Sequence, residues 1–174
     1  LGNPVRNEIL NPPTKEEALK KYNFNPENKT IFIFGGSLGA RSINLAVEKN
    51  LKEFGKMNVN IIWQIGKNYV IPAVIPPNII ATEFIDDMAT AYSGSDLVVA
   101  RSGATTVAEV AVLAKPSILV PLPSASNNEQ YENARMLDES DAAILIKDED
   151  IEGSLLDTVK KILENEDGLF AMSE

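Results

Sequence analysis

The sequence predicts an α/β protein, specifically a doubly wound, Rossmann-like domain with about six parallel strands flanked by helices. Short apolar runs alternate along the chain with longer stretches whose apolar residues recur at helical spacing. The strand candidates are apolar on consecutive residues, which is typical of parallel strands buried on both faces. The length of 174 residues suits one domain of this kind.

The elements are expected in regular alternation along the chain. Strands are expected at Thr30–Phe34, Asn60–Ile65, Ile79–Phe84, Asp96–Ala100, Ser117–Val120 and Ala143–Ile146. The first helix is expected in a stretch with Ile43, Val47, Leu51 and Phe54, and Gly55 is expected as its C-cap. A short helix is expected at Asp86–Ser93, stopped by Gly94, and another at about 104–114. The last two are expected in a stretch with Tyr131, Ala134 and Leu137 on one face and at Ile151–Leu163.

The composition excludes several classes of function. The sequence has no cysteine and no histidine, which excludes disulfides, thiolate metal sites and the commonest general base. A net charge of −9 argues against a nucleic-acid partner, because duplex binding needs clustered Lys and Arg. No apolar run approaches the roughly 20 residues that cross a bilayer. The opening residues Leu1–Arg6 lack the features of a signal peptide, and we expect the chain to be cut from a longer protein.

The fold class predicts where a ligand binds. In open parallel sheets, ligands lie outside the carboxyl ends of the strands, near the point where the strand order reverses. The segments that directly follow the expected strands are therefore the candidates for the site, and they are Gly35–Arg41, Gly66–Lys67, Ile85–Met88, Arg101–Glu109 and Pro121–Gln130.

The first of these segments is a glycine-rich loop between a strand and a helix. Gly35, Gly36 and Gly39 let backbone N–H groups approach a phosphate closely, and the helix N-terminus adds positive potential. The loop lacks the Lys of a P-loop and the glycine spacing of a dinucleotide fingerprint. Ser37 either donates its hydroxyl to a phosphate oxygen or caps the helix.

The segment Arg101–Glu109 allows two interpretations of Glu109. Thr106 and Glu109 have the spacing of a capping box, in which Glu109 only stabilises the start of its own helix. Alternatively, the two carboxylate oxygens of Glu109 accept hydrogen bonds from the vicinal hydroxyls of a ribose. Two glycine-bearing loops that face one crevice favour the nucleotide interpretation.

Three further polar segments have ordinary structural interpretations. Asp86 and Asp87 open a helix, where acidic residues favour the macrodipole, while the backbone of Ile85 is placed to pair with a base edge. The amide of Gln130 suits sugar hydroxyls but also suits a polar helix start. The run Asp148–Asp150 is interpreted as a solvated turn, and no compact Asp-x-Asp metal motif is present.

Together these segments resemble the C-terminal half of the GT-B glycosyltransferases that attach N-acetylglucosamine to lipid I. The matching stretches occur in the family's order and cover almost the whole chain, and they are Gly2–Arg6, Gly35–Asn44, Trp63–Lys67, Glu83–Val110, Lys115–Pro123 and Asn127–Ala134. The resemblance implies an interdomain linker at residues 1–12 and a donor-binding domain at residues 13–174.

The resemblance also implies a binding site for the donor UDP-N-acetylglucosamine. Ser37 would contact a phosphate, the backbone of Ile85 would hold uracil, and Glu109 would accept from the ribose. Gln130 would bind the hydroxyls of the sugar. The full expected donor site consists of Arg6, Ser37, Ile85, Met88, Ala104, Thr105, Thr106, Val107, Ala108, Glu109 and Gln130, beside the phosphate loop of Gly35, Gly36 and Gly39.

The implied activity is an inverting transfer of N-acetylglucosamine to the C4 hydroxyl of lipid I, which makes lipid II for peptidoglycan. The family's acceptor site, proposed general base and membrane contact belong to an N-terminal domain that is absent here. This chain alone is therefore expected to bind donor without a metal and to catalyse nothing. The whole protein is expected to be cytoplasmic and peripheral on the inner face of the bacterial membrane.

Two alternatives and one departure qualify this interpretation. A UDP-N-acetylglucosamine 2-epimerase shares the architecture, but it needs acid–base residues in the cleft, and this chain has no histidine. A non-catalytic nucleotide-sugar-binding module is the alternative outside enzymes. Many members of the family that this chain resembles have His where this chain has Glu129, next to Gln130.

Overall fold

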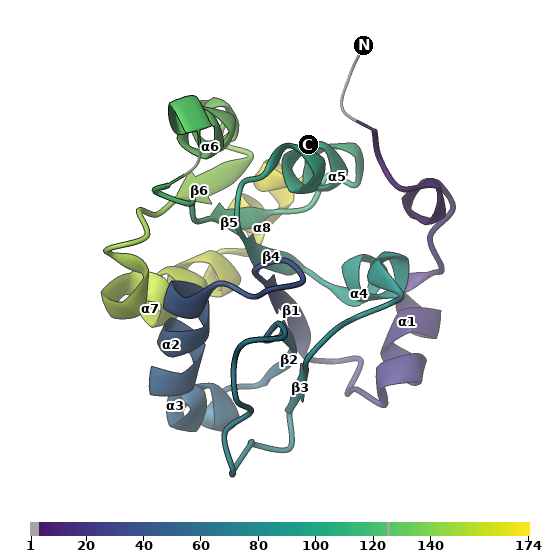
Figure 1. Ribbon diagram of the computed structural model, residues 1–174. Coiled ribbons are helices and arrows are strands. Elements are labelled where there is room, and N and C mark those ends of the chain that lie inside the picture. Colours follow the sequence, from purple (N-terminus) through teal and green to yellow (C-terminus); the bar gives the residue numbers. More distant parts are fainter. Residues whose placement is uncertain (1–3, 125) are drawn as a thin grey trace.

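The computed structural model describes residues 4–124 and 126–174. Its strands are β1 (Lys29–Phe34), β2 (Val59–Gln64), β3 (Ile79–Thr82), β4 (Leu97–Ala100), β5 (Ser117–Leu119) and β6 (Ala143–Leu145). They form one six-stranded sheet in the order β3-β2-β1-β4-β5-β6, and every pair of neighbours is parallel (Figure 1). The expectation of a doubly wound α/β domain with six parallel strands is confirmed.

Helices connect successive strands and cover the sheet. They are the 3-10 helices η1 (Asn7–Leu10) and η2 (Ser126–Asn128) and the α-helices α1 (Lys15–Tyr22), α2 (Arg41–Lys49), α3 (Leu51–Lys56), α4 (Met88–Gly94), α5 (Ala104–Val112), α6 (Glu129–Glu139), α7 (Ile151–Glu164) and α8 (Glu166–Met172). Within the described residues, no helix is both long enough and apolar enough to cross a bilayer.

The core is divided between the two faces of the sheet. On one face, α2, α3, α7 and α8 pack on the strands around the fully buried Trp63. On the other, η1, α4 and α5 pack around Phe32 and Tyr92, and α1 lies against α4. Figure 1 shows these two groups on opposite sides of the sheet. Ile9 of η1 is 1% exposed within the second cluster, so the segment before α1 is packed onto the domain.

Three expectations about helices are wrong. The stretch from Ile43 to Phe54 is two helices, α2 and α3, because the side chain of Asn50 donates to the carbonyl oxygen of Ala46 (2.7 Å) and competes with the backbone there. Gly55 is therefore inside α3, not at a C-cap. Gly94 likewise is the last residue of α4 and not the residue that stops it.

Two helices, α1 and α8, were not expected from the sequence. The start of α1 is marked by a capping box, in which Thr14 and Glu17 each bond the other's backbone N–H. That spacing is legible in the sequence and is the signal by which α1 could have been found. The start of α8 is capped by Asn165, whose side chain accepts from the N–H of Gly168.

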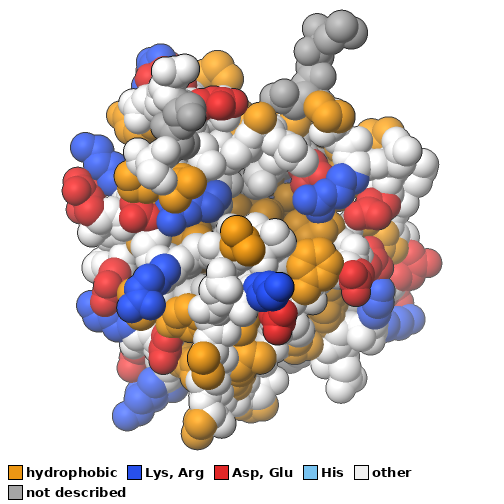
Figure 2. Space-filling model, in the orientation of Figure 1, with side chains coloured by type: hydrophobic (Ala, Val, Ile, Leu, Met, Phe, Trp, Pro, Cys, Tyr) orange, Lys and Arg blue, Asp and Glu red, His pale blue; other side chains and the backbone are white. Residues whose placement is uncertain are grey.

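The strand order fixes the position of the ligand-binding crevice. The chain moves outward from β1 to β2 and β3 and then returns to β4 on the other side of β1, so the order reverses between β1 and β4. Phe34 at the end of β1 pairs with Gln64 and with Ala100, which aligns the carboxyl ends of three strands. On the face shown in Figure 2, hydrophobic and uncharged atoms fill much of the centre, and charged side chains lie among them and around the rim.

Candidate nucleotide-binding site

A hollow of about 380 Å³ lies at the carboxyl edge of the sheet, next to this reversal. It is lined by Arg6, Glu8, Phe34, Gly36, Ser37, Gln64, Phe84, Ile85, Asp86, Met88 and Thr106. Five residues of the expected donor site, Arg6, Ser37, Ile85, Met88 and Thr106, are therefore brought together from four segments far apart in the sequence. Gly36 of the expected phosphate loop also lines this hollow.

The glycine loop after β1 has a shape that only glycine permits. Gly36 and Gly39 have φ values of +88° and +82°. A Cβ on Gly39 would lie 2.2 Å from the carbonyl oxygen of Ile65, so the loop touches the chain that follows β2. Ser37 is exposed at the rim of the hollow. The N-cap of α2 is Ala40, so the interpretation of Ser37 as the cap is wrong.

The N-terminus of α5 has no side-chain cap. Its N-cap is Gly103, which has no side chain to accept from the first amides of the helix. Such amides carry positive potential and suit an anion. Thr106 reaches the hollow, whereas the side chain of Val107 packs against Leu119 and Ala134 in a core cluster. Ala104, Thr105 and Ala108 lie on the same helix but do not line the hollow, and their donor contacts stay predictions.

Glu109 is the most unusual residue of the site, because it is 0% exposed. The hydroxyl of Tyr92 donates to its Oε2 over 3.0 Å, and the Nε of Arg6 lies 3.4 Å from its Oε1. Glu109 stands six positions after the N-cap Gly103, beyond the first turn of α5. The capping-box interpretation of Glu109 is therefore wrong, and its partners come from α4 and from the segment before η1.

The loop after β3 forms the other wall of the hollow. The backbone N–H of Ile85 donates to Oε1 of Gln64 (2.8 Å). A base that pairs with the backbone of Ile85 therefore donates a hydrogen bond to the carbonyl oxygen of Ile85. Asp87 is the N-cap of α4 and accepts from the N–H of Thr90, as expected for a structural carboxylate. Hydrogen bonds from Lys21 and Thr90 lower the pKa of Asp87 to about 2.

Gln130 does not line this hollow. Its Oε1 accepts from the N–H of Leu122 (2.9 Å), which ties α6 to the loop after β5, and its Nε2 lies 3.9 Å from the position of a Cβ on Gly103. It is therefore close to the start of α5, and its contact with the sugar stays a prediction. The neighbouring Glu129 is exposed. Gly2 and Asn3, which belong to the first matching stretch, lie outside the described residues.

The interpretation of Asp148–Asp150 as a solvated turn is wrong for Asp148, which is bonded to two other side chains. Its Oδ1 accepts from the guanidinium of Arg101 (2.5 Å) and from the hydroxyl of Ser42 (2.5 Å). The three side chains join the ends of β4 and β6 to the first turn of α2, the helix that follows the glycine loop. In residues 4–124 and 126–174, no cluster of acidic side chains has the grouping of a metal site. Metal independence stays a prediction.

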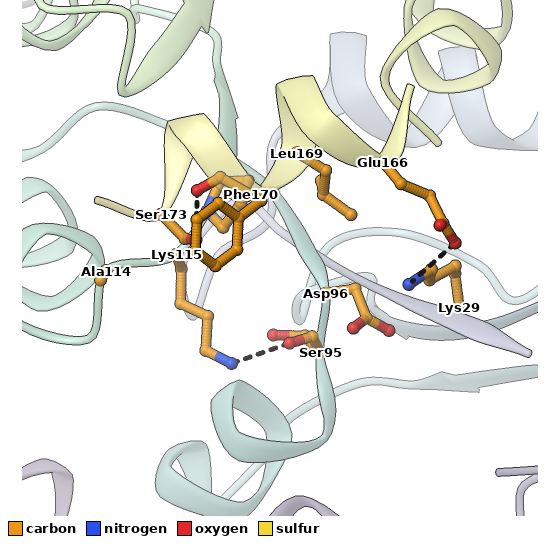
Figure 3. Close-up of a pocket in the computed structure, with 10 residues that line it drawn as sticks. Lys29, Ser95, Asp96, Ala114, Lys115, Glu166, Leu169, Phe170 and Ser173 are labelled. Carbon is orange, nitrogen blue, oxygen red and sulfur yellow. Dashed lines mark hydrogen bonds and ion pairs between the residues drawn. The ribbon is translucent and has the colours of Figure 1, made fainter. Parts of the chain in front are cut away.

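A second hollow of about 370 Å³ lies at the opposite edge of the sheet, where β1, β4 and β5 begin. Figure 3 shows Lys115 pointing to the carbonyl oxygen of Ser95 (2.8 Å) and Lys29 pointing to Glu166. Burial lowers the pKa of Lys115 to about 8. None of the motifs expected to bind a ligand lies here, and the cations already have partners. The first hollow is therefore the better candidate.

Comparisons with known proteins agree with this fold. A family model described as the glycosyltransferase family 28 C-terminal domain matches residues 30–174. The UDP-N-acetylglucosamine--N-acetylmuramyl-(pentapeptide) pyrophosphoryl-undecaprenol N-acetylglucosamine transferase of Bacteroides fragilis is 42% identical over 99% of this chain and 48% of that protein. The protein of the same name from Parabacteroides distasonis is 39% identical over 99% of this chain and 49% of its own length.

A solved structure is also similar. The crystal structure of Acinetobacter baumannii MurG has a TM-score of 0.72 and 31% identity, and the match covers 95% of this chain and 48% of that one. The chain thus spans about half the length of the relatives it matches. The fold and the position of the hollow define a GT-B C-terminal, Rossmann-like domain. More particularly, the chain belongs to the glycosyltransferase family 28 C-terminal domain family.

Proposed function

We propose that this chain is the donor-binding half of an N-acetylglucosaminyltransferase and that it binds UDP-N-acetylglucosamine in the hollow beside β1 and β4. The observation that carries the proposal is the convergence of Arg6, Ser37, Ile85, Met88 and Thr106 on one hollow. The names of the relatives at 42% and 39% identity support the donor and the transferred sugar. The uracil lies against Ile85, and the diphosphate lies between the glycine loop and α5.

The reaction of the whole protein is an inverting displacement. A hydroxyl of the acceptor attacks the anomeric carbon, the bond from that carbon to UDP breaks, and the hydroxyl proton passes to a base outside this chain. Negative charge develops on the departing diphosphate. The absence of a side-chain cap at the N-termini of α2 and α5 supports the proposal that their backbone amides stabilise this charge without a metal.

The acceptor is a lipid-linked muramyl pentapeptide, in keeping with the names of the relatives. The C4 hydroxyl of its muramyl sugar is the group that attacks, and the product is lipid II. A further domain holds this acceptor and contacts the inner face of the bacterial membrane. This chain alone therefore binds donor and does not turn it over.

Calorimetric titration of the chain tests the proposal. Saturable binding is expected for UDP-N-acetylglucosamine and for UDP, with weaker binding of UDP-glucose. The variant Glu109→Gln keeps the size of the side chain and should weaken UDP binding about tenfold or more, since a hydrogen bond to a charged group contributes roughly 1.5–3 kcal/mol. Glu48→Gln is the matched control, because Glu48 also accepts from a tyrosine, Tyr69, outside the hollow. Absence of UDP binding at millimolar concentration contradicts the proposal.

A further inference from the structure

Tyr92 is held in a fixed position behind the candidate site. It is 0% exposed, and its ring packs edge-on against Phe32 and Phe34 with centroids 5.3 Å and 5.9 Å away. Its hydroxyl donates to Oε2 of Glu109 over 3.0 Å. Because the ring is immobilised by packing, this hydrogen bond fixes the direction of the Glu109 carboxylate.

The other carboxylate oxygen of Glu109 has a different environment. Among the described residues, no group donates a hydrogen bond to Oε1, although the atom is buried. A buried acceptor without a hydrogen bond costs roughly 1–3 kcal/mol, so such atoms are uncommon unless they serve a ligand. The Nε of Arg6 is 3.4 Å away, and the Arg6 side chain is 43% exposed. Arg6 lines the hollow, whereas Glu109 does not.

We propose that Tyr92 positions Glu109 for the ribose of the donor and that Arg6 occupies the place of the ribose until the donor binds. The inference rests on the proposed function. Tyr92 holds Oε2 and leaves Oε1 directed at Arg6. When a nucleotide enters, a ribose hydroxyl donates to Oε1 and Arg6 turns outward to the diphosphate. The exchange replaces an ion pair that lacks a hydrogen bond with a charge-assisted hydrogen bond.

The chemistry of Tyr92 suits this role. Burial raises the pKa of its hydroxyl, and the charge of Glu109 raises it further, so the group stays protonated and remains a donor. Arg6 comes from the segment before η1, while Glu109 is on α5 and Tyr92 is on α4. The exchange at Oε1 therefore couples binding of the donor to the position of Arg6 in the N-terminal segment of this chain.

The test compares UDP with 2′-deoxy-UDP in titrations of the wild-type chain and of Tyr92→Phe. The wild type should prefer UDP about tenfold, and the variant should lower that preference to within about threefold, because its Glu109 is no longer held in place. Tyr69→Phe is the control, since it removes another tyrosine–glutamate hydrogen bond whose two residues do not line the hollow, and it should keep the wild-type preference.

A second variant tests the role of Arg6 without relying on Tyr92. Uridine has a ribose but no phosphate, so Arg6→Ala should bind uridine about threefold more tightly or better while it binds UDP less tightly. An unchanged UDP preference in Tyr92→Phe, or uridine binding that does not improve in Arg6→Ala, overturns the inference and leaves the proposed function standing. A wild-type chain that binds none of these compounds overturns the proposed function and the inference with it.

Discussion

The side-chain oxygen of Gln64 accepts a hydrogen bond from the backbone N–H of Ile85 over 2.8 Å. The amide nitrogen of the same side chain donates to the carbonyl oxygen of Gly36 (3.1 Å). One buried residue at the end of β2 thus joins the glycine loop to the loop after β3. The two walls of the candidate site are therefore held at a fixed separation by a residue that the sequence did not single out.

Replacing Gln64 should damage both stability and binding. Gln64→Met leaves the N–H of Ile85 without its partner and removes one of the two donors to the carbonyl of Gly36, which also accepts from the N–H of Gly39. The variant should lose about 1–3 kcal/mol of unfolding free energy and about tenfold in UDP affinity. Urea denaturation and calorimetry measure the two effects. Asn60→Leu is the matched control, because Asn60 is a buried amide at the other end of the same strand. If UDP binds Gln64→Met as tightly as wild type, Gln64 does not organise the site.

Gly36 should resist substitution for a backbone reason alone. Its φ is +88°, and apart from its chain neighbours no atom of the described residues lies within 4 Å of an added Cβ, so Gly36→Ala meets no clash but should lose about 1–2 kcal/mol of stability. Gly153→Ala is the control, because Gly153 is inside α7 with equally open surroundings and should gain about 0.5–1 kcal/mol. Equal effects of the two substitutions in chemical denaturation would show that the loop is not strained.

Lys115 should make stability rise with pH. Burial lowers its folded pKa to about 8 from the ordinary 10.5, while nearby Asp96 opposes the shift. Between these two values the unfolded chain binds more protons than the folded one, so unfolding becomes less favourable as the pH increases. The stability difference between wild type and Lys115→Met should therefore shift in favour of wild type from pH 8 to 10.5. A difference that is flat across this range contradicts the assignment.

Removal of metal ions should leave donor binding unchanged. In the proposed site, the diphosphate is stabilised by the positive potential of backbone amides at the starts of α2 and α5. Chelators do not affect these amides. UDP affinity with and without EDTA should agree within about twofold. A loss of affinity with EDTA that a divalent ion restores would place a metal in the site.

The strands could be predicted because each is a continuous apolar run, and all six were found within one or two residues of their ends. The helix boundaries depended on side-chain bonds that the pattern does not reveal. Asn50 bonding to Ala46 divides one expected helix into two. The N-cap of α5 is Gly103 and not Thr106, so Thr106 and Glu109 have the spacing of a capping box but do not form one.

The site was predictable where it depends on chain position after a strand. Ser37 and Ile85 follow β1 and β3 directly, and the parallel sheet brings both to one edge. The roles of Tyr92 and Gln64 were not predictable, because each acts through a contact between segments distant in sequence. Gln130 was expected in the site, but its orientation is set by the N–H of Leu122, a tertiary contact.

The central claim is that the donor binds at the carboxyl edge of β1 and β4. Backbone amide chemical-shift mapping during titration with UDP-N-acetylglucosamine tests it most directly, since it locates the ligand without a substitution. The account predicts that the largest shifts occur at Gly36, Ser37, Ile85 and Thr106. Largest shifts at Lys29 and Lys115, on the opposite edge of the sheet, would contradict it, and so would the absence of shifts at saturating ligand.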